Sequence, residues 1–302
     1  MSVAHRDLRS PGRRARNGAA DRRARLMIHL VLSLVSLMVL LPVLLVVSSS
    51  FASESAIGHY GYSLLPRNLS LDAYRFLFES GAQIPQAYRV SLIVTFGGAS
   101  LSLLVMSLIA YPLSRRDFAL RRPLSFYVFF TMLFNGGLVP FYIMMTQYLH
   151  LGNTLWALIL PYLVVPFYVL ILRTFFAGIP FELIEAAKLD GAGEWRIFLR
   201  IVLPLSTPAL ATVGLFSILT YWNDWYQALL FISDQDKYPL QYLLYNINAN
   251  IGAVSNNLTM GITPPTNTGR MAMAVLAIGP VAFVFVFVQR FFVRGLTLGS
   301  LK

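Results

Sequence analysis

The chain has 302 residues, of which 57% are hydrophobic and only 12% are charged, and its formal net charge is +11. A soluble domain carries about 25% charged residues, so the composition excludes an ordinary soluble protein. Because cysteine is absent and the four histidines are scattered without metal-ligand spacing, the chain offers no disulfide, thiol or metal chemistry.

Hydropathy along the chain predicts an all-α integral membrane protein. Six apolar runs are long enough to cross the roughly 30 Å hydrocarbon core of a bilayer as helices. Helices are the expected structure because lipid cannot hydrogen-bond a bare backbone. The runs cover residues 26–47, 90–110, 124–145, 154–172, 207–231 and 271–288.

The first 25 residues contain eight arginines and precede the first apolar run. Alone they resemble a basic nucleic-acid-binding arm, but no aromatic residues that could stack on bases accompany them. We therefore expect a disordered cytoplasmic tail beside anionic membrane lipid, and no nucleic-acid partner. The apolar run 26–47 is longer than the core of a cleaved signal peptide, which favours an uncleaved signal-anchor. Residues 26–302 are expected to form one transmembrane domain.

The distribution of Lys and Arg predicts the orientation in the membrane. Segments 1–25, 111–123, 173–206 and 289–302 together hold 19 of the 24 Lys and Arg residues, and the alternate segments hold 5. Loops rich in Lys and Arg stay in the cytoplasm. Both termini and the loop 173–206 are therefore predicted to be cytoplasmic.

The loop between the fourth and fifth runs carries the most informative pattern. Good helix formers predict a helix over Phe181–Leu189, and Gly191 suits the left-handed position that ends it. A second helix is expected over residues 194–202, so residues 179–204 would form a rigid projection of two short helices. The fixed positions of the pattern are Glu185, Ala186, Ala187, Gly191, Ile201, Leu203 and Pro204.

This pattern resembles the EAA loop of ATP-binding-cassette (ABC) import permeases, with every fixed position filled. From about residue 27 to the end, the chain also resembles the carbohydrate branch of these permeases, of the maltose-importer type, and within it the Lpl-like oligosaccharide branch. The segments that carry this likeness are 134–140, 153–157, 173–176, 221–225, 238–241 and 291–302.

The resemblance implies a MetI-like fold of six transmembrane helices, the fold of type I importers, in a bacterial cell membrane. The chain would form half of a pore with a second, non-identical permease subunit. Two cytoplasmic ABC ATPases would bind below, and an extracytoplasmic sugar-binding protein would deliver solute from above. The chain has no phosphate-binding Gly-Lys-Ser/Thr loop, so ATP is expected on the separate ATPase, with no cofactor and no catalytic residue here.

The resemblance also implies that residues 179–204 are the coupling loop, which docks on the ATPase. Its candidate coupling residues are Glu185, Ala186, Ala187, Asp190 and Gly191. The alternative is that the charged residues of this helix form a solvated face, with pairs worth only about 0.2–0.5 kcal/mol each.

A polar and aromatic group interrupts the fifth run: Trp222, Asn223, Asp224 and Trp225. Ionisable groups within membranes usually face a pore or a partner, and aromatic rings with Asn and Asp suit sugars. If the run is one helix, residues 222 and 225 share a face. These four residues are candidates for the substrate path, with a membrane-interface or structural role as the alternative. The polar outer loop 232–270 is either a contact for the binding protein or a solvated connector.

Two further functions compete with import of a carbohydrate. An ABC importer for another solute would carry the same coupling loop. A secondary transporter that needs no ATPase would instead show internal repeats or charged relays at the midplane, which the sequence lacks. No catalytic constellation supports a membrane enzyme.

Overall fold

The computed structural model describes residues 12–79, 83–256 and 266–299, and within these ranges the regular elements are helical. The prediction of an all-α fold is confirmed. The helices are α1 (Gly12–Ser50), α2 (Glu54–Tyr60), α3 (Asp72–Glu79), α4 (Gln83–Leu92), α5 (Gly98–Ser114), α6 (Arg121–Leu133), α7 (Leu138–Ile143), α8 (Trp156–Ile159), α9 (Pro166–Ala177), α10 (Phe181–Leu189), α11 (Glu194–Ile197), α12 (Leu203–Leu205), α13 (Thr207–Trp222), α14 (Tyr226–Phe231), α15 (Leu240–Asn256) and α16 (Thr266–Gly299).

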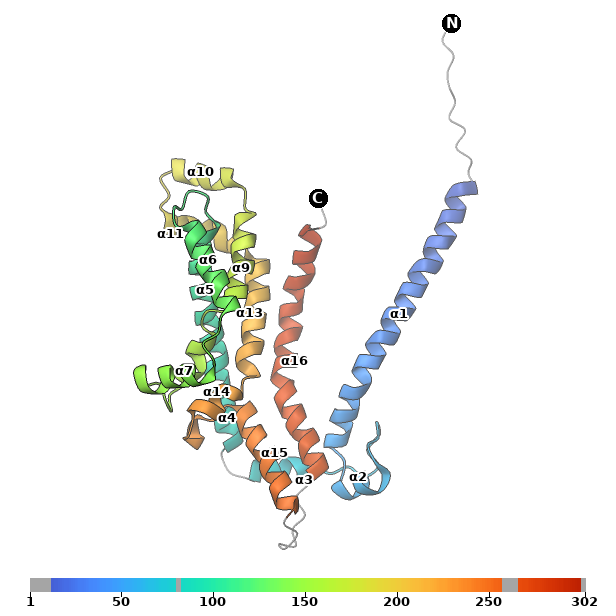
Figure 1. Ribbon diagram of the computed structural model, residues 1–302. Coiled ribbons are helices and arrows are strands. Elements are labelled where there is room, and N and C mark those ends of the chain that lie inside the picture. Colours follow the sequence, from blue (N-terminus) through green and yellow to red (C-terminus); the bar gives the residue numbers. More distant parts are fainter. Residues whose placement is uncertain (1–11, 80–82, 257–265, 300–302) are drawn as a thin grey trace.

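The centre of the molecule is a helical bundle in which α5 packs against α9 and α13 (Figure 1). Helix α6 covers α5 and α9, and α16 packs on α13. Helix α10 lies at one end of the bundle, and α2, α3 and α15 lie at the other. Helix α1 begins and α16 ends toward the end that carries α10. The start of α1 and the end of α16 therefore lie on the same side as the expected coupling loop.

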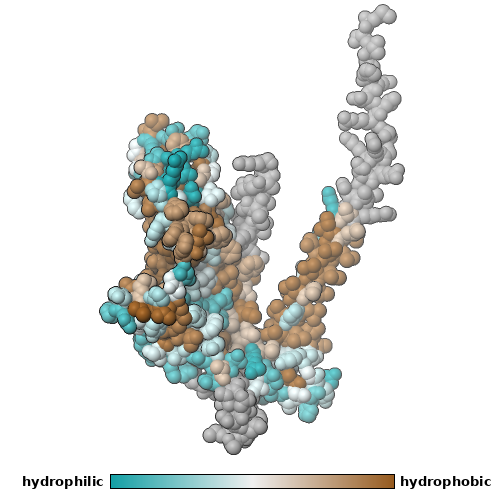
Figure 2. Space-filling view, in the orientation of Figure 1, coloured by the Kyte–Doolittle hydropathy of each residue, from teal (hydrophilic) through white to brown (hydrophobic). Residues whose placement is uncertain are grey.

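Three helical stretches are long and apolar enough to cross a membrane: Ala24–Ser50, Gln83–Ser114 and Thr266–Val286. Three bent helix pairs raise this number to six if each pair is one span. Figure 2 shows hydrophobic surface along α1 and the middle of the bundle, with hydrophilic surface toward the ends. The first two bent pairs cover the predicted runs 124–145 and 154–172. The third pair covers residues 194–222 and overlaps the predicted run 207–231 only from residue 207.

Helix α1 leans away from the bundle and packs against α16 near the outer ends of both helices (Figure 1). In the most apolar 18-residue window of its span, Ala24–Ser50, no residue is buried within this chain. A helix that is apolar on all sides needs lipid or another protein around it. Helix α1 begins at Gly12, so the part of the expected tail that the structure describes, residues 12–25, is helical.

The third and fourth predicted spans are bent. Helix α6 is followed, after a 112° bend, by the stretch Leu138–Tyr148, and the bend in the fourth span is 51°. Gly137 has φ of 87°, and its N–H donates to the side-chain oxygen of Asn135 at 2.9 Å. The polar and glycine residues at 135–137 therefore make a kink, because only glycine adopts this backbone conformation without strain.

The fifth predicted span is not one helix. Helix α13 ends at Trp222, three residues follow in irregular structure, and α14 starts at Tyr226. The expectation that residues 222 and 225 share a helical face is therefore wrong. The outer segment 232–270 is also more than a connector, since it contains the 17-residue helix α15 and the start of α16. Residues 257–265, including its Pro264-Pro265 pair, lie outside the described residues.

Candidate functional site: the coupling loop and the outer cavity

Helix α10 ends in a glycine-dependent turn. Gly191 has φ of 75°, and its N–H donates to the carbonyl of Lys188 at 3.0 Å. The next N–H, that of Ala192, donates to the carbonyl of Ala187 at 2.9 Å. This pair of bonds is the Schellman arrangement, which satisfies the last carbonyls of a helix and reverses the chain. The turn leads into α11, which begins at Glu194, and so joins the two short helices predicted for the projection.

The expected coupling loop, residues 179–204, is anchored by apolar residues on one side and exposed on the other. Ile184 from α10 and Ile197 and Phe198 from the second helix are buried in a cluster formed with α5, α9 and α13. On the open side, Leu189 is 89% exposed and Trp195 is 68% exposed.

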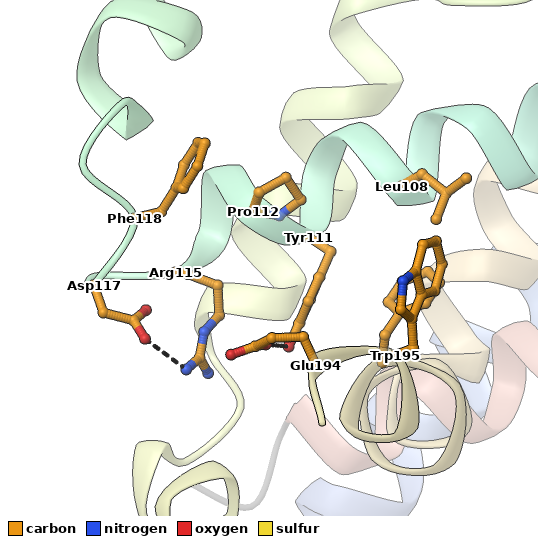
Figure 3. A pocket seen from close by; sticks show the side chains of 9 residues that line it. Leu108, Tyr111, Pro112, Arg115, Asp117, Phe118, Glu194 and Trp195 are labelled. Atoms are coloured by element: carbon orange, nitrogen blue, oxygen red, sulfur yellow. Dashed lines mark hydrogen bonds and ion pairs between the residues drawn. The ribbon is translucent and has the colours of Figure 1, made fainter. Parts of the chain in front are cut away.

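A charge network fixes α10 to two other elements. The Lys188 ammonium lies 3.0 Å from a carboxylate oxygen of Asp117, after α5, and 2.8 Å from one of Glu194, on α11. Arg115 also pairs with Asp117, at 3.2 Å, and the Tyr111 hydroxyl donates to Glu194 (Figure 3). The network forms part of the wall of a cavity of about 390 Å³, which Trp195 also lines. The end of α10 is therefore joined to the C-terminal end of α5 and to α11 by this network.

The electrostatics of the network favour its charged form. Hydrogen bonds from Lys188 to Glu194 and Asp117 raise the pKa of its ammonium. Burial raises the pKa of the Asp117 carboxyl, but the bonds from Lys188 and Arg115 outweigh it and leave that pKa lowered. The pKa of Glu194 is lowered in the same way, by Lys188 and Tyr111 against the effect of burial. Between the carboxylate and ammonium ranges, all three groups remain ionised.

The motif residues themselves face outward. Glu185, Ala186 and Asp190 are exposed, and Ala187 is half-buried. Within the described ranges, neither the Glu185 nor the Asp190 carboxylate belongs to an ion pair. Their charges are therefore available to another protein, and α10 is held by Lys188 rather than by the motif acids.

The sequence analysis missed Tyr111, Arg115 and Asp117 as parts of this site. One signal was present, because Asp117 is the only acidic residue in the basic segment 111–123. An acidic residue among four arginines suggests a specific ion-pair partner. Asp117 and Lys188 are 71 residues apart in the sequence, so the sequence alone does not identify Lys188 as that partner.

The four candidate residues of the fifth span separate into different environments. Trp222 is 4% exposed, and its indole N–H donates to the carbonyl of Ala277 on α16 at 2.9 Å. The Asp224 carboxylate accepts a hydrogen bond from the Tyr162 hydroxyl at 3.2 Å. Asn223 is exposed and donates to a backbone carbonyl of its own helix. Trp222 and Asp224 therefore hold the break between α13 and α14 in place.

Of the four, Trp225 lines a cavity. It is 38% exposed and lines a hollow of about 380 Å³ beside α15 and α16, which we call the outer cavity. Tyr245 and Arg270 line the same cavity and were not singled out from the sequence. No local pattern linked them, because the three residues come from three separate elements.

Comparison with known proteins agrees with this architecture. A family model described as "Binding-protein-dependent transport system inner membrane component" matches residues 11–298. The polygalacturonan/rhamnogalacturonan transport system permease protein YtcP of Bacillus subtilis (strain 168) is 41% identical over 280 residues, covering 92% of this chain and 97% of YtcP. Protein LplC of the same strain is 37% identical over 265 residues, covering 87% of this chain and 89% of LplC.

A solved structure is also similar to this chain. It belongs to a bacterial ABC transporter involved in the import of the acidic polysaccharide alginate, and the match has a TM-score of 0.78 at 27% identity. The match covers 90% of this chain and 98% of that one. The resemblance to carbohydrate ABC permeases is thereby confirmed, and these relatives are transport components rather than enzymes. The chain belongs to the family of binding-protein-dependent transport system inner membrane components, the membrane-spanning permeases of ABC importers.

Proposed function

We propose that this chain is one of two permease subunits of an ATP-driven bacterial importer for oligosaccharides. The observation that carries the proposal is the exposed helix α10, closed by Gly191 and held by Lys188 to both α5 and α11. A rigid projection of this kind transmits force from a separate ATPase to the spans. YtcP and the alginate importer, whose names refer to polysaccharides, support a carbohydrate as the solute.

The coupling loop is proposed to dock on the ATPase through its exposed side. Glu185, Ala186 and Asp190 supply the polar part of the contact, beside the exposed Leu189. Ala187 and Gly191 maintain the turn behind that surface. Closure of two ATPases would bring two such loops together, and the network at Lys188 would carry the displacement into α5.

The remaining partners follow from the same proposal. Helix α1 is proposed to be covered by lipid and by a second, non-identical permease, because this chain does not bury it. Both termini and the coupling loop lie in the cytoplasm of the cell, in agreement with the positive-inside rule. A binding protein delivers the sugar to the opposite side. Of the four candidates in the fifth span, Trp225 is the proposed sugar contact.

Reconstitution of the whole importer tests this function. The two permeases, the ATPase and the binding protein would be placed in liposomes, and uptake of a labelled oligosaccharide would be measured with and without internal ATP. We expect uptake only when ATP and the binding protein are both present. Uptake driven by an ion gradient in the absence of ATP would instead support the secondary-transporter alternative. Uptake of amino acids or phosphate but of no sugar would support an importer for another solute.

A further inference from the structure

The outer cavity combines aromatic, amide and cationic groups. Its aromatic wall consists of Trp225 and Tyr245, whose rings stack with centroids 4.5 Å apart and planes inclined by 18°. The two side chains are 38% and 43% exposed, so part of the stack is open to a ligand. Gln241 and Asn248 add amide groups to the lining. A stacked pair has little freedom to move, which makes it a preorganised platform for the face of a sugar ring.

Arg270 is the cation of this cavity. Its Nε donates to the side-chain oxygen of Asn248 at 3.0 Å, which fixes the guanidinium plane. Within the part of the chain that the structure describes, Arg270 belongs to no ion pair. The remaining N–H groups of the guanidinium can therefore donate two parallel hydrogen bonds to a carboxylate.

Three other cations on the predicted outer side have partners, whereas Arg89, on α4, is exposed and belongs to no ion pair within the described residues. Arg75 lies 3.8 Å from Asp72, and Lys237 lies 3.2 Å from Asp234. Arg67 lies over the ring of Tyr60, at 4.6 Å from its centroid. Arg270 differs from Arg75 and Lys237 because an amide rather than an acid holds it, and from Arg89 because it lines the outer cavity. Since Arg270 also lines a cavity with an aromatic wall, its charge is suited to a ligand that enters there.

The walls of the cavity are held by contacts behind them. The bond from the Trp222 indole to the Ala277 carbonyl joins the end of α13 to α16 beside the cavity. Trp225 follows three residues later, in the break before α14. Tyr245 and Arg270 come from α15 and α16, which pack against each other. The aromatic platform and the guanidinium are therefore held in a defined relationship by the fold.

We propose that the outer cavity binds a carboxylated sugar, so that the substrate class of the importer is an oligosaccharide that contains uronic acid. The sugar ring lies against Trp225 and Tyr245, and its carboxylate binds the Arg270 guanidinium. The side-chain amides of Gln241 and Asn248 accept hydrogen bonds from ring hydroxyls or donate hydrogen bonds to them. An acidic sugar would gain charge-assisted hydrogen bonds from the exposed Arg270 guanidinium that a neutral sugar cannot form, which favours the acidic one. The inference rests on the proposed function of oligosaccharide import.

The test uses the complete importer in liposomes, with trigalacturonate and its methyl ester as matched acidic and neutral probes. We expect Arg270→Gln to lower uptake of trigalacturonate by about tenfold or more, because the charge-assisted bonds are lost. Uptake of the methyl ester should change much less. Arg270→Lys keeps the charge and should retain part of the acidic uptake, which shows that the subunit still assembles. The control is Arg75→Gln, which removes an exposed outer cation away from the cavity and should leave both rates within about twofold.

The outcomes separate this inference from the proposed function. Unchanged uptake of trigalacturonate by Arg270→Gln would overturn the carboxylate contact, and so would an equal loss for the acidic and neutral probes. Import of neutral oligosaccharides without any import of trigalacturonate would also overturn it, while leaving oligosaccharide import intact. Failure to import any sugar would refute the proposed function itself. An anionic lipid headgroup is the competing ligand, and a defect in Arg270→Gln that depends only on the phosphatidylglycerol content of the liposomes would favour it.

Discussion

The carboxylate of Glu54 accepts hydrogen bonds from both the backbone N–H and the hydroxyl of Thr268, at 2.9 and 2.8 Å. Its second oxygen accepts from Thr266 and from the backbone and side chain of Asn267, each at 3.0 Å. Glu54 stands on α2, directly after the first span, and its partners form the first turn of α16. One side chain therefore caps the sixth span and ties the first span to it.

Replacing Glu54 by Gln is expected to destabilise the subunit. The amide keeps one acceptor oxygen but loses the charge at the positive end of α16, and we expect a loss of about 1–3 kcal/mol, reduced by the partial exposure of the site. Thermal unfolding of the purified complex measures this. Asp72→Asn is the control, because the ion pair of Asp72 with Arg75 is exposed and contributes little. Equal midpoints for the two variants would show that Glu54 does not hold the spans together.

The same contact predicts a pH dependence. Burial raises the pKa of Glu54, but hydrogen bonds from Thr268 and Asn267 outweigh it and leave the pKa lowered. A carboxyl with a lowered folded pKa contributes stability that is fully present above its unfolded pKa of about 4.3 and is lost as the pH falls through the folded value. The wild type should therefore lose more stability than Glu54→Gln below about pH 4.5. Parallel stability curves over this range would contradict the prediction.

Gly98 marks the tightest packing between α5 and α13. A Cβ atom at this position would lie 2.8 Å from two ring atoms of Tyr221. That ring cannot move easily, because it is 3% exposed and its hydroxyl donates to the carbonyl of Ile159 at 2.9 Å. Gly98→Ala is expected to destabilise the complex by about 1–3 kcal/mol. Gly97→Ala is the matched control, since a Cβ there meets no atom within 4 Å, and similar thermal midpoints for the two variants would count against this packing.

The coupling loop could be predicted from sequence because its determinants are local. Helix formers over Phe181–Leu189 and a glycine at position 191 specify the helix and its end within a few residues. The break after Trp222 was missed for the opposite reason. Apolar residues continue to Phe231, and hydropathy alone does not distinguish an interrupted span from a continuous one. The Tyr162 hydroxyl donates to the Asp224 carboxylate and stabilises the break between α13 and α14. These two residues are 62 positions apart in the sequence, so no local pattern reveals the contact.

Of the residues that line the outer cavity, the sequence predicted only Trp225, as a candidate for the substrate path. Trp225, Tyr245 and Arg270 come together only because α15 folds back against α16. The polar composition of segment 232–270 predicted a loop. The segment instead contains the 17-residue helix α15, in spite of its many asparagines. Tertiary packing therefore stabilises α15 as a helix and also determines which of its residues line the cavity.

Cysteine labelling tests the orientation. The chain has no native cysteine, so a single introduced thiol gives an unambiguous signal. Leu189 is 89% exposed on the coupling loop, and Leu65 is 81% exposed at the opposite end. A membrane-impermeant maleimide applied to intact cells should label Leu65→Cys and leave Leu189→Cys unlabelled until the membrane is opened. Labelling of Leu189→Cys in intact cells would reverse the topology.

Substitution of two nearby glycines distinguishes the effect of the left-handed backbone conformation at the turn from the effect of simply losing a glycine in the coupling loop. Gly191 has φ of 75°, where an alanine is strained, whereas Gly193 has φ of −69° and ψ of 160°, which any residue adopts. Neither position has an atom within 4 Å of an added Cβ, so steric contact is the same for both. Gly191→Ala should disfavour the turn by about 1–2 kcal/mol, which lowers the population of the correct turn by a factor on the order of 5–30. Coupled uptake and co-purification of the ATPase should both fall several-fold as a result. Gly193→Ala should behave like the wild type. If Gly191→Ala imports sugar and retains its ATPase as well as Gly193→Ala does, the left-handed turn at Gly191 is not needed for coupling.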